Sequence, residues 1–511
     1  MNLSRSVLES IDRSKGLHLP TPEALDYPEK VLQFGTGVLL RGLPDFIINE
    51  ANNKGIFNGR IVIVKSTVQG SVDAFTTQDG LYTVCVRGLK EEKLVSENHV
   101  VGAVSRVLSA ATEWSKILEC ASNPDMQVVI SNTTEVGITL VKENAHADPP
   151  VSFPGKLLSF LYHRFKFFKG DPEKGMVVIP TELISANGDK LLSIVLELAH
   201  YNNLEIAFID WIENANHFCN SLVDRIVPGK RQPAEQSAIE KELGYKDELL
   251  VMSEVYSLWA IQSSNEKVKS ILSFAKEGSA AIIAPDIHVF RELKLRLLNA
   301  PHTFGCGLAY LSGCDTVKQA MDSQVFSGYL KGLMFEEIIP SIISESISQS
   351  EAEAFAHKVL DRYRNSFIDH AWINITLQYS TKMNMRNSML IKNYYSRFGQ
   401  VPTYMSLGMA GHILFLRAQN SSEGYSGTRN GLAYPIKDDN AEVYQKAWTK
   451  DNLNETVKAI LASEKLWEDD LNGYIGFTDA VVYWLAIMLE RGVAETLAMA
   501  VNQKTTEVNE K

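Results

Sequence analysis

Cysteine is scarce in this chain, and its basic residues never gather into a run. The five cysteines are an odd number without closely spaced pairs, which argues against a disulfide framework and against the usual zinc-binding spacings. The formal net charge of −11, without a Lys/Arg-rich stretch, opposes binding to nucleic acid or anionic lipid. We therefore expect buried thiols in a reducing compartment, no metal site and no nucleic-acid partner. The cysteines are Cys85, Cys120, Cys219, Cys306 and Cys314.

Long apolar runs are also missing. No stretch approaches the roughly 20 residues that span a bilayer, and the first twelve residues contain no apolar signal core. These absences predict a cytoplasmic protein without a membrane partner. With 511 residues, 45% of them hydrophobic, the chain is too long for a single core, so two domains are expected.

Short β-branched runs alternate with longer helical patterns in the first half of the chain. This alternation is typical of a parallel sheet covered by helices, and several runs are apolar nearly throughout, as strands buried on both faces are. The pattern predicts an α/β domain over residues 1–287. The expected strands are Val31 to Phe34, Arg60 to Val64, Gln127 to Ser131, Met176 to Ile179, Ile206 to Ile209 and Ala280 to Ala284.

After about residue 288 the alternation stops and amphipathic helical patterns follow. They are clearest at Glu351 to Arg364, Asn454 to Trp467 and Thr478 to Arg491. The sequence therefore predicts a mainly α-helical C-terminal domain over residues 288–511. The polar, glycine-bearing interval Gln419 to Gly431 is expected to be a surface loop.

A glycine pair lies between the first apolar run and a helical pattern. In the stretch Phe34, Gly35, Thr36, Gly37, the backbone has the context in which amides at a helix N-terminus receive a pyrophosphate. Arg41, in the first helical turn, either pairs with a phosphate oxygen or is solvated. The third glycine of the dinucleotide fingerprint is missing, so an ordinary strand-to-helix turn is the alternative.

Two further segments fit a Rossmann-like domain. Thr133, Thr134 and Glu135 follow the strand Gln127 to Ser131, at the sheet edge where ligands bind, and we expect them to line the nicotinamide end. The alternative is a polar loop with a helix cap. Lys65 ends the second strand where NAD-binding proteins usually have an acid, and a lysine there would tolerate a 2′-phosphate, so NADP remains possible.

Lys294, Asn299 and His302 form a set of groups that handle protons on what the sequence predicts as one helix. At about 100° per residue, Asn299 falls about 140° and His302 about 80° from Lys294, so the three can border one cavity. Pro301 should kink or end the helix there. Singly, each residue is most simply a solvated lysine, a terminal amide or a buried imidazole. Together, a base and two donors can deprotonate an alcohol and stabilise the oxyanion.

The spacing Lys294-x4-Asn299-x2-His302 resembles the catalytic signature of the polyol-specific long-chain dehydrogenases, the mannitol dehydrogenase family. A second resemblance is the stretch from Phe218 to Gly229, and the glycine turn lies where the family has it, so the likeness spans most of the chain. The resemblance implies NAD-dependent hydride transfer at a CH–OH group with Lys294 as general base. It also implies that Asn299, His302 and an upstream Asn187 polarise the substrate oxygen.

Arg291 stands where many polyol dehydrogenases of that family carry an acid three residues before the lysine. This departure favours a small anionic sugar acid over a neutral polyol, with Arg291 meeting the substrate carboxylate unless it is simply solvated. Lys382 and Arg386, four residues apart, are the second choice for that contact. A nucleotide-binding sensor that has lost catalysis is a further alternative, which the intact Lys294 disfavours.

Overall fold

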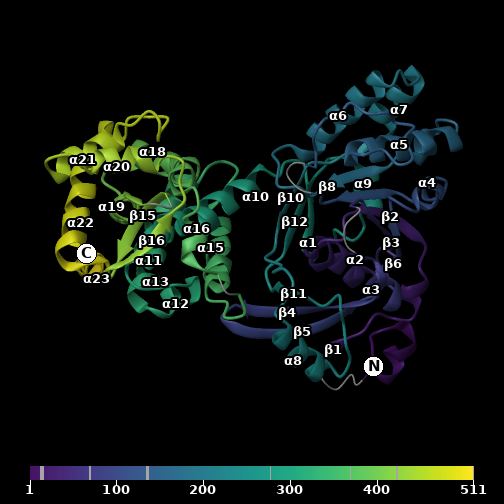
Figure 1. Cartoon of the computed structure of the whole chain (residues 1–511), viewed down its shortest axis with the longest axis horizontal. Helices are drawn as coiled ribbons and strands as arrows, with labels where there is room; N and C mark the ends of the chain where they lie inside the picture. The colour runs from purple at the N-terminus through teal and green to yellow at the C-terminus, as the bar shows by residue number, and fades with distance from the viewer. Residues whose placement is uncertain are drawn as a thin grey trace. The chain divides into compact units, whose positions relative to one another are not determined.

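The computed structural model describes residues 1–11, 16–67, 71–133, 137–276, 278–368, 370–421 and 424–509 (Figure 1). The chain divides into two compact units: Met1–Gly88 with Leu94–Ile287, and Leu89–Lys93 with His288–Lys511. The first unit is α/β and the second is mainly helical, which confirms the predicted fold class. Among the described residues, no helix combines the length and the apolar character needed to cross a bilayer.

A six-stranded parallel sheet forms the centre of the first unit. Its strand order is β6-β3-β2-β7-β8-β9, and every neighbouring pair is parallel. The strands expected at residues 31–34, 60–64, 127–131 and 176–179 are confirmed as β2, β3, β7 and β8. The strands are β2 (Glu29–Phe34), β3 (Arg60–Lys65), β6 (Val104–Ser109), β7 (Val128–Ser131), β8 (Val177–Pro180) and β9 (His217–Phe218).

Apolar cores lie on both faces of this sheet. Leu32 and Val129 contribute to one core, while Val31 and Val128 contribute to the other, so side chains alternate between faces as a buried strand requires. The first core is built with α4 (Trp114–Ala121), α5 (Phe153–Phe167), α6 (Asn187–Tyr201) and α7 (Ile206–Ala215); α1 (Val38–Gly42) and α2 (Pro44–Asn53) pack in the second.

The expected strand Ile206 to Ile209 is wrong, because these residues form the first turn of α7. Phe208, Ile209 and Ile212 are buried in the core of the sheet, whereas Ile206 is exposed. A run of four apolar residues has the same composition in a buried strand and in a buried helix turn. Only the continuation of the pattern through Ile212 distinguishes the two.

Two smaller sheets complete the first unit. One has the order β1-β5-β4-β11 and the other the order β10-β12-β13. The expected strand Ala280 to Ala284 is confirmed as β13, although it pairs with β12 and lies outside the six-stranded sheet. The strands are β1 (Leu17–His18), β4 (Tyr82–Lys90), β5 (Lys93–Val101), β10 (Ser221–Asp224), β11 (Val251–Glu254), β12 (Leu258–Gln262) and β13 (Ala281–Ala284); the short helices are η1 (Arg5–Ser10), η3 (Glu23–Asp26), α3 (Asp73–Thr77), η4 (Pro172–Lys174), α8 (Pro233–Leu243) and α9 (Glu266–Ile271).

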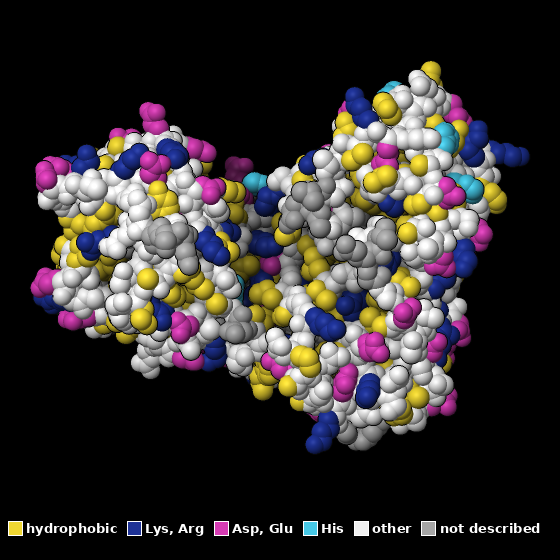
Figure 2. Space-filling view, in the orientation of Figure 1, with side chains coloured by type: hydrophobic (Ala, Val, Ile, Leu, Met, Phe, Trp, Pro, Cys, Tyr) yellow, Lys and Arg dark blue, Asp and Glu magenta, His cyan; other side chains and the backbone are white. Residues whose placement is uncertain are grey.

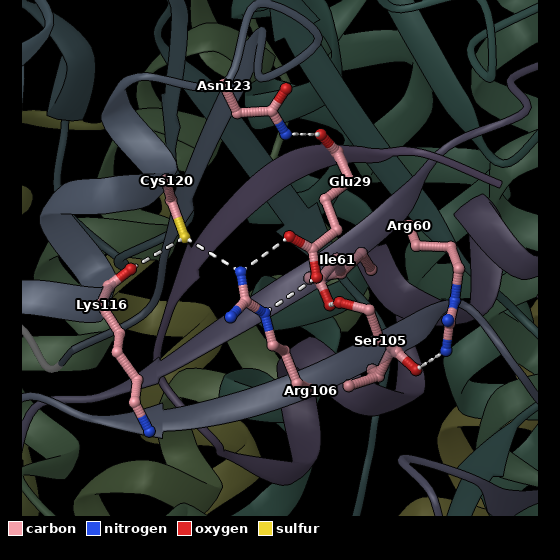
Figure 3. Close-up of polar contacts among 9 residues, drawn as sticks. Glu29, Arg60, Ile61, Ser105, Arg106, Lys116, Cys120 and Asn123 are labelled. Atoms are coloured by element: carbon pink, nitrogen blue, oxygen red, sulfur yellow. Dashed lines mark hydrogen bonds and ion pairs between the residues drawn. The ribbon is translucent and has the colours of Figure 1, made fainter. Parts of the chain in front are cut away.

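Polar contacts secure the edge strand β6 (Figure 3). Arg106 on β6 donates two hydrogen bonds of 2.9 Å, from Nε and Nη2, to the carboxylate of Glu29 at the start of β2. Ser105 Oγ donates to the carbonyl of Ile61 on β3 at 3.0 Å. A bidentate pair of this kind fixes orientation as well as distance, so β6 is held in register on the far side of β3.

The second unit consists of packed helices, three segments of which are π-helical. The helices expected at 351–364, 454–467 and 478–491 are confirmed as α15, α21 and α22, although α21 already ends at Leu461. The elements are α10 (His288–Leu293), η5 (Lys294–Asn299), α11 (Ala300–Leu311), α12 (Val317–Asp322), α13 (Gln324–Lys331), η6 (Gly332–Ile338), α14 (Ile339–Ile342), α15 (Gln349–Tyr363), α16 (Trp372–Ile375), α17 (Tyr379–Met383), η7 (Asn384–Ser388), α18 (Met389–Phe398), α19 (Thr403–Phe415), α20 (Ala441–Ala447), α21 (Leu453–Leu461), η8 (Leu471–Gly473), α22 (Phe477–Arg491) and α23 (Val493–Asn509), with η5, η6 and η7 as the π-helices.

The expected surface loop at residues 419–431 is wrong for its described part. These residues contribute to a three-stranded antiparallel sheet of β14 (Gln419–Ser421), β15 (Gly424–Arg429) and β16 (Leu432–Ile436). The buried ring of Tyr434 on β16 packs at 4.7 Å, centroid to centroid, on Phe415. The strands β14 and β15 are polar because they are largely outside the core, and the sequence pattern of such strands is the same as that of a loop.

On the face shown in Figure 2, Lys and Arg side chains are interspersed with Asp and Glu side chains over both units. Charges of both signs are therefore mixed on this face, within a chain whose formal net charge is −11.

Candidate active site

The glycine turn joins β2 to α1 at the carboxyl edge of the parallel sheet. Gly35 has φ +130°, and a Cβ there would lie 2.9 Å both from the carbonyl oxygen of Asn132 and from Cδ1 of Leu40. Only glycine fits such a position. A Cβ at Gly37 would meet no atom within 4 Å, so the backbone just before α1 faces open space. This geometry fits a pyrophosphate approached by backbone amides.

Leu40 occupies the position of the missing third glycine. It is fully buried and its side chain lies over Gly35, so the space that Gly35 leaves is filled by Leu40. The ring of Phe34 is also in the core, 5.0 Å from the ring of Phe153. Of the residues predicted to contact the cofactor, Phe34 therefore has only its backbone available for that contact, while Thr36 and Gly37 are partly or fully exposed.

Arg41 is buried beneath the turn. Its Nε donates to the carbonyl of Thr36 at 3.3 Å, and its Nη1 donates to the carbonyl of Leu249. The guanidinium also lies 5.5 Å from the ring centre of Tyr82. Burial lowers the pKa of Arg41 from its usual range. These contacts favour a structural role for Arg41, in which it holds the glycine turn in place. They do not support the predicted contact between Arg41 and a phosphate.

Glu182, which the sequence analysis missed, holds the loop after β7. Its Oε1 accepts from the backbone N–H of Thr133 at 2.9 Å and from the Thr133 hydroxyl at 3.0 Å, and its Oε2 accepts from Ser131 Oγ at 3.1 Å. The predicted cofactor residue Thr133 is thereby fixed at the sheet edge. Thr134 and Glu135 lie outside the described residues. The one signal in the sequence for Glu182 was an acid two residues after the end of β8.

Asn187, at the start of α6, has its carboxamide fully engaged inside the first unit. Its Oδ1 accepts from the N–H groups of Gly188 at 3.0 Å and Ser221 at 2.9 Å. Its Nδ2 lies at 3.0 to 3.1 Å from the carbonyls of Pro180, Glu182 and Ser221. The contacts connect β8, α6 and β10. These hydrogen bonds favour a structural role for Asn187. The predicted contact between Asn187 and a substrate oxygen stays a prediction, and this geometry does not support it.

In the second unit, Lys294 and Asn299 are the first and last residues of the π-helix η5. Pro301 was predicted to kink or end the helix. The chain instead stays helical, and Pro301 lies in the first turn of α11. The hydrogen-bond pattern changes, because π-helices close wider turns than α-helices; such segments are frequent at functional sites. The angles expected for a uniform α-helix therefore do not apply between Lys294 and Asn299.

His302 is a buried imidazole with an unpaired nitrogen. The residue is 8% exposed, and its ring stacks on Tyr363 with 4.0 Å between the ring centroids. Its Nε2 has no hydrogen-bond partner among the described residues. Burial, together with His370, Arg386 and Arg362, lowers the pKa of His302 well below its usual value. A neutral ring with an orphaned polar atom is costly unless a ligand pairs with it, which marks this position as a binding site.

Arg386 lies near His302, and Lys382 lies near Arg386. Arg386, on η7, donates from Nη1 to the hydroxyl of Thr303 at 3.0 Å, directly after His302 in the chain. Lys382, on α17, donates to the carbonyl of Ile375 at 3.0 Å. Burial lowers the pKa of both side chains, and the Arg386 cation lowers the pKa of Lys382 further. Neither side chain forms an ion pair within the described part of the chain.

Arg291 is half-buried on α10, one turn before Lys294. No hydrogen bond joins its guanidinium to the side chains of Lys294, Asn299 or His302 in the described ranges. The cations that act on His302 are Arg386 and Arg362, together with His370 when it is protonated. Of the predicted carboxylate-binding residues, Arg386 is therefore the one that the structure places beside the imidazole.

Comparisons with known proteins match nearly the whole chain. Residues 29–272 match the mannitol dehydrogenase Rossmann domain, and residues 286–488 match the mannitol dehydrogenase C-terminal domain. An altronate oxidoreductase of Halalkalibacterium halodurans is 36% identical over 93% of this chain and 94% of its own length. Altronate oxidoreductases of Bacillus subtilis (35%, 92% and 95%) and Bacteroides thetaiotaomicron (34%, 94% and 99%) are similarly close.

Two solved structures have the same fold. The ternary complex of Pseudomonas fluorescens mannitol 2-dehydrogenase with NAD and D-mannitol is 20% identical, with a TM-score of 0.66 over 98% of this chain and 100% of its own. A substrate-free D-sorbitol dehydrogenase is 19% identical, with a TM-score of 0.77 over 97% of this chain and 100% of its own. At these identities the likeness concerns the fold alone.

Proposed function

The chain belongs to the mannitol dehydrogenase family of NAD-dependent oxidoreductases acting on CH–OH groups, and from this premise we propose that it is an altronate oxidoreductase, interconverting altronate and the ketone tagaturonate. The observation that carries the proposal is the Arg386 cation beside the orphaned nitrogen of His302, with the Lys382 amine four residues earlier on α17; neither cation is ion-paired with a carboxylate in the described chain. An anionic sugar supplies that partner. The relatives named altronate oxidoreductase, at 34% to 36% identity over more than nine-tenths of the chain, support the same substrate.

We assign the proton transfer to Lys294. In reduction of the ketone, NADH held at the glycine turn would supply the hydride for the new C–H bond at the carbonyl carbon. Lys294 in its ammonium form gives a proton from Nζ to the carbonyl oxygen, which becomes the hydroxyl; in oxidation the neutral amine takes that proton back. The atoms and charges balance in both directions. The position of Lys294 at the start of η5 supports this assignment.

We assign stabilisation of the developing alkoxide to Asn299 and His302. His302 remains neutral because burial and nearby cations keep its pKa low, so it acts as a hydrogen-bond donor through Nε2 and not as the proton source. Asn299 lies at the other end of η5 from Lys294 and offers an amide donor without charge.

For the cofactor we propose NAD over NADP. Lys65, the residue that would accept a 2′-phosphate, is buried at the end of β3, and its Nζ donates to the carbonyl of Thr67. An amine engaged with the backbone and shielded from solvent is poorly placed to receive a second phosphate. The open backbone at Gly37 serves the pyrophosphate that both cofactors share.

A substrate panel tests the proposed activity. The full-length protein is assayed with NADH and with NADPH against tagaturonate, fructuronate, and the neutral ketoses fructose and xylulose. The proposal expects the highest kcat/KM for tagaturonate with NADH. A preference for fructuronate assigns the chain to fructuronate reduction, a preference for a neutral ketose assigns it to mannitol or arabinitol dehydrogenation, and no turnover with any of them leaves the sensor alternative.

The role of Lys294 is tested separately by Lys294→Ala, with Lys318→Ala as the matched control. Lys318 is a lysine of the same unit whose amine is paired with Asp322. We expect Lys294→Ala to lose at least about a hundredfold in kcat while still binding NADH, since general acid–base catalysis contributes roughly 10² to 10⁴ in rate. Turnover near that of the control at neutral pH removes Lys294 from its assigned role.

The carboxylate contact is tested by comparing Arg386→Gln with Arg291→Gln. Loss of a charged hydrogen bond costs about 1.5 to 3 kcal/mol, so the variant that removes it should raise KM for tagaturonate roughly ten- to a hundredfold. The contacts of Arg386 with Thr303 and its proximity to His302 favour Arg386. If KM rises only in Arg291→Gln, the contact belongs to Arg291.

A further inference from the structure

A cluster of two histidines and a glutamate lies in the first unit, where β1 pairs with β5. The pairing is parallel, and His18 lies directly opposite His99. Their rings stack with 4.4 Å between centroids. Glu97 is two residues before His99 on the same strand, so all three side chains are on one face of the sheet. One ligand atom from each of the three lies within 4.8 Å of the others.

The buried member, His99, is approached by a carboxylate at each ring nitrogen. Nε2 lies 3.2 Å from Oε2 of Glu97, and Nδ1 lies 3.3 Å from Oε1 of Glu50 on α2. His99 is only 6% exposed, and its Nδ1 makes no hydrogen bond with the described residues. A neutral imidazole carries one N–H, so one of the two carboxylates faces a lone pair. When the N–H is on Nδ1, toward Glu50, the lone pair of Nε2 faces Glu97, and a cation held between Nε2 and Glu97 removes the conflict.

We propose that His18, Glu97 and His99 form a binding site for a divalent transition-metal ion, of which Zn²⁺ fits the donors best. Two imidazoles and a carboxylate are a common zinc ligand set that keeps one coordination position open. The 3.2 Å between His99 Nε2 and Glu97 Oε2 matches the edge of a tetrahedron with metal bonds of about 2.0 to 2.1 Å. Glu50 then holds Nδ1 of His99, as carboxylates behind metal-bound histidines do.

His18 is the ligand that has to move. Its ring is exposed and stacks nearly parallel to His99, with 15° between the ring planes, so its nitrogens do not yet converge on the point that His99 faces. Rotation of an exposed side chain brings a nitrogen there at little cost. The two carboxylates of Glu50 and Glu97 balance the double charge of the ion.

The sequence predicted no metal site because its cysteines lack the close spacing of common zinc sites. Here the ligands come from two strands far apart in the chain, and only the β1–β5 register joins them. β1 is two residues long and lies at the edge of its sheet. A metal ion shared by His18 and His99 would fasten this short strand to β5, so its expected effect is structural and independent of the proposed dehydrogenase activity.

The test uses full-length protein freed of metal with a chelator and titrated with Zn²⁺ by calorimetry. We expect one site per chain and a melting temperature that rises with the Zn²⁺ concentration. His18→Ala and Glu97→Gln should each weaken the binding at least about a hundredfold, and Glu50→Gln roughly ten- to a hundredfold. His163→Ala, which removes an exposed histidine on α5, should bind as the wild type does.

Co²⁺ provides the second measurement, because its visible spectrum reports the ligands. The expected spectrum has the d–d bands of a site with nitrogen and oxygen donors, lost in His18→Ala. Because His18 is exposed, this variant should unfold in urea at the same concentration as the metal-free wild type, which shows that it is folded. The proposal is overturned by the absence of one-to-one binding, by binding that survives in His18→Ala, or by a thiolate charge-transfer band that places the ion on a cysteine.

Discussion

Arg296 donates a hydrogen bond of 2.6 Å from its Nη1 to the backbone carbonyl oxygen of Arg386. Arg296 lies within η5, between Lys294 and Asn299, and Arg386 lies within η7, so the contact joins the two π-helices that carry the candidate site. The Nε of Arg296 also pairs with Glu292 at 3.1 Å, one turn earlier. One buried guanidinium thus connects the segment of Lys294 with the segment of Arg386, the cation that we propose binds the substrate.

We predict that Arg296→Gln lowers kcat/KM for the anionic ketone roughly ten- to a hundredfold, with a rise in KM as well as a fall in kcat. The lost contact is a charged hydrogen bond in a buried setting, which contributes about 1.5 to 3 kcal/mol. Steady-state kinetics check this result. Arg397→Gln is the control, because Arg397 also donates to backbone carbonyls, those of Pro340 and Ile343. Equal kinetics in the two variants would show that η5 and η7 keep their spacing without Arg296.

Glu182 offers a prediction for cofactor binding. Glu182→Ala removes the acceptor of three hydrogen bonds from Ser131 and Thr133, and we expect the Kd for NADH to rise roughly tenfold or more as the loop after β7 loosens. Fluorescence titration with NADH measures this. Glu182→Gln is the matched control, since its remaining oxygen still accepts from Thr133 and the Ser131 hydroxyl can reverse its role. A Kd that rises equally in both variants would assign the effect to the negative charge of Glu182.

The glycine turn gives a steric prediction. Gly35→Ala places a methyl group 2.9 Å from a backbone oxygen at φ +130°, so the turn must shift, and we expect NADH binding to be lost together with a fall in melting temperature. Gly55→Ala is the control, because Gly55 has φ +65° with no atom within 4 Å of an added Cβ. It should cost only about 1 kcal/mol of stability and leave the Kd for NADH unchanged. Normal NADH binding by Gly35→Ala would exclude the turn from the cofactor site.

Regular elements were predictable from the sequence where burial dictates the pattern. The strands β2, β3, β7 and β8 are apolar because both of their faces are covered, and α15 and α22 carry clear apolar stripes. The pattern failed at residues 206–209, where four apolar residues begin a helix, and at the exposed strands after residue 418. In both places the neighbours in space, which the sequence does not display, decide the structure.

The candidate site was predictable only where its residues are close in sequence. Lys294, Asn299 and His302 share one segment, so their spacing was visible. The partners of Arg41, Asn187 and Arg296 are backbone carbonyls from distant segments, and a carbonyl has no signature in the sequence. The π-helical form of η5 could not be predicted either, because its residues do not distinguish a π-helix from an α-helix.

A buried carboxyl under the glycine turn gives a prediction for stability against pH. Asp45 is fully buried on α2, where it accepts from the Tyr82 hydroxyl at 3.0 Å and from Gln33 Nε2 at 3.4 Å. Burial raises the pKa of Asp45 from 3.8 to about 7, against the opposite effect of these bonds. Between these two pH values the folded protein keeps a proton that the unfolded chain releases. The free energy of unfolding therefore falls as the pH rises from about 4 to about 7, and above 7 the loss is complete.

Asp45→Asn removes this titration, so its effect should depend on pH in a definite direction. Near pH 4 to 5 the wild type has a neutral carboxyl and should match the variant closely. At pH 8 the wild type has an ionised, buried carboxylate, so the variant should be more stable by up to about 4 kcal/mol, the value of three pKa units. Urea unfolding at both pH values measures the difference. Asp26→Asn, which neutralises an exposed carboxylate paired with Arg5, should keep the pH dependence of the wild type. If Asp45→Asn also keeps the pH dependence of the wild type, another buried group causes the loss of stability. Asp247 is then the next group to test, since burial raises the pKa of its carboxyl as well.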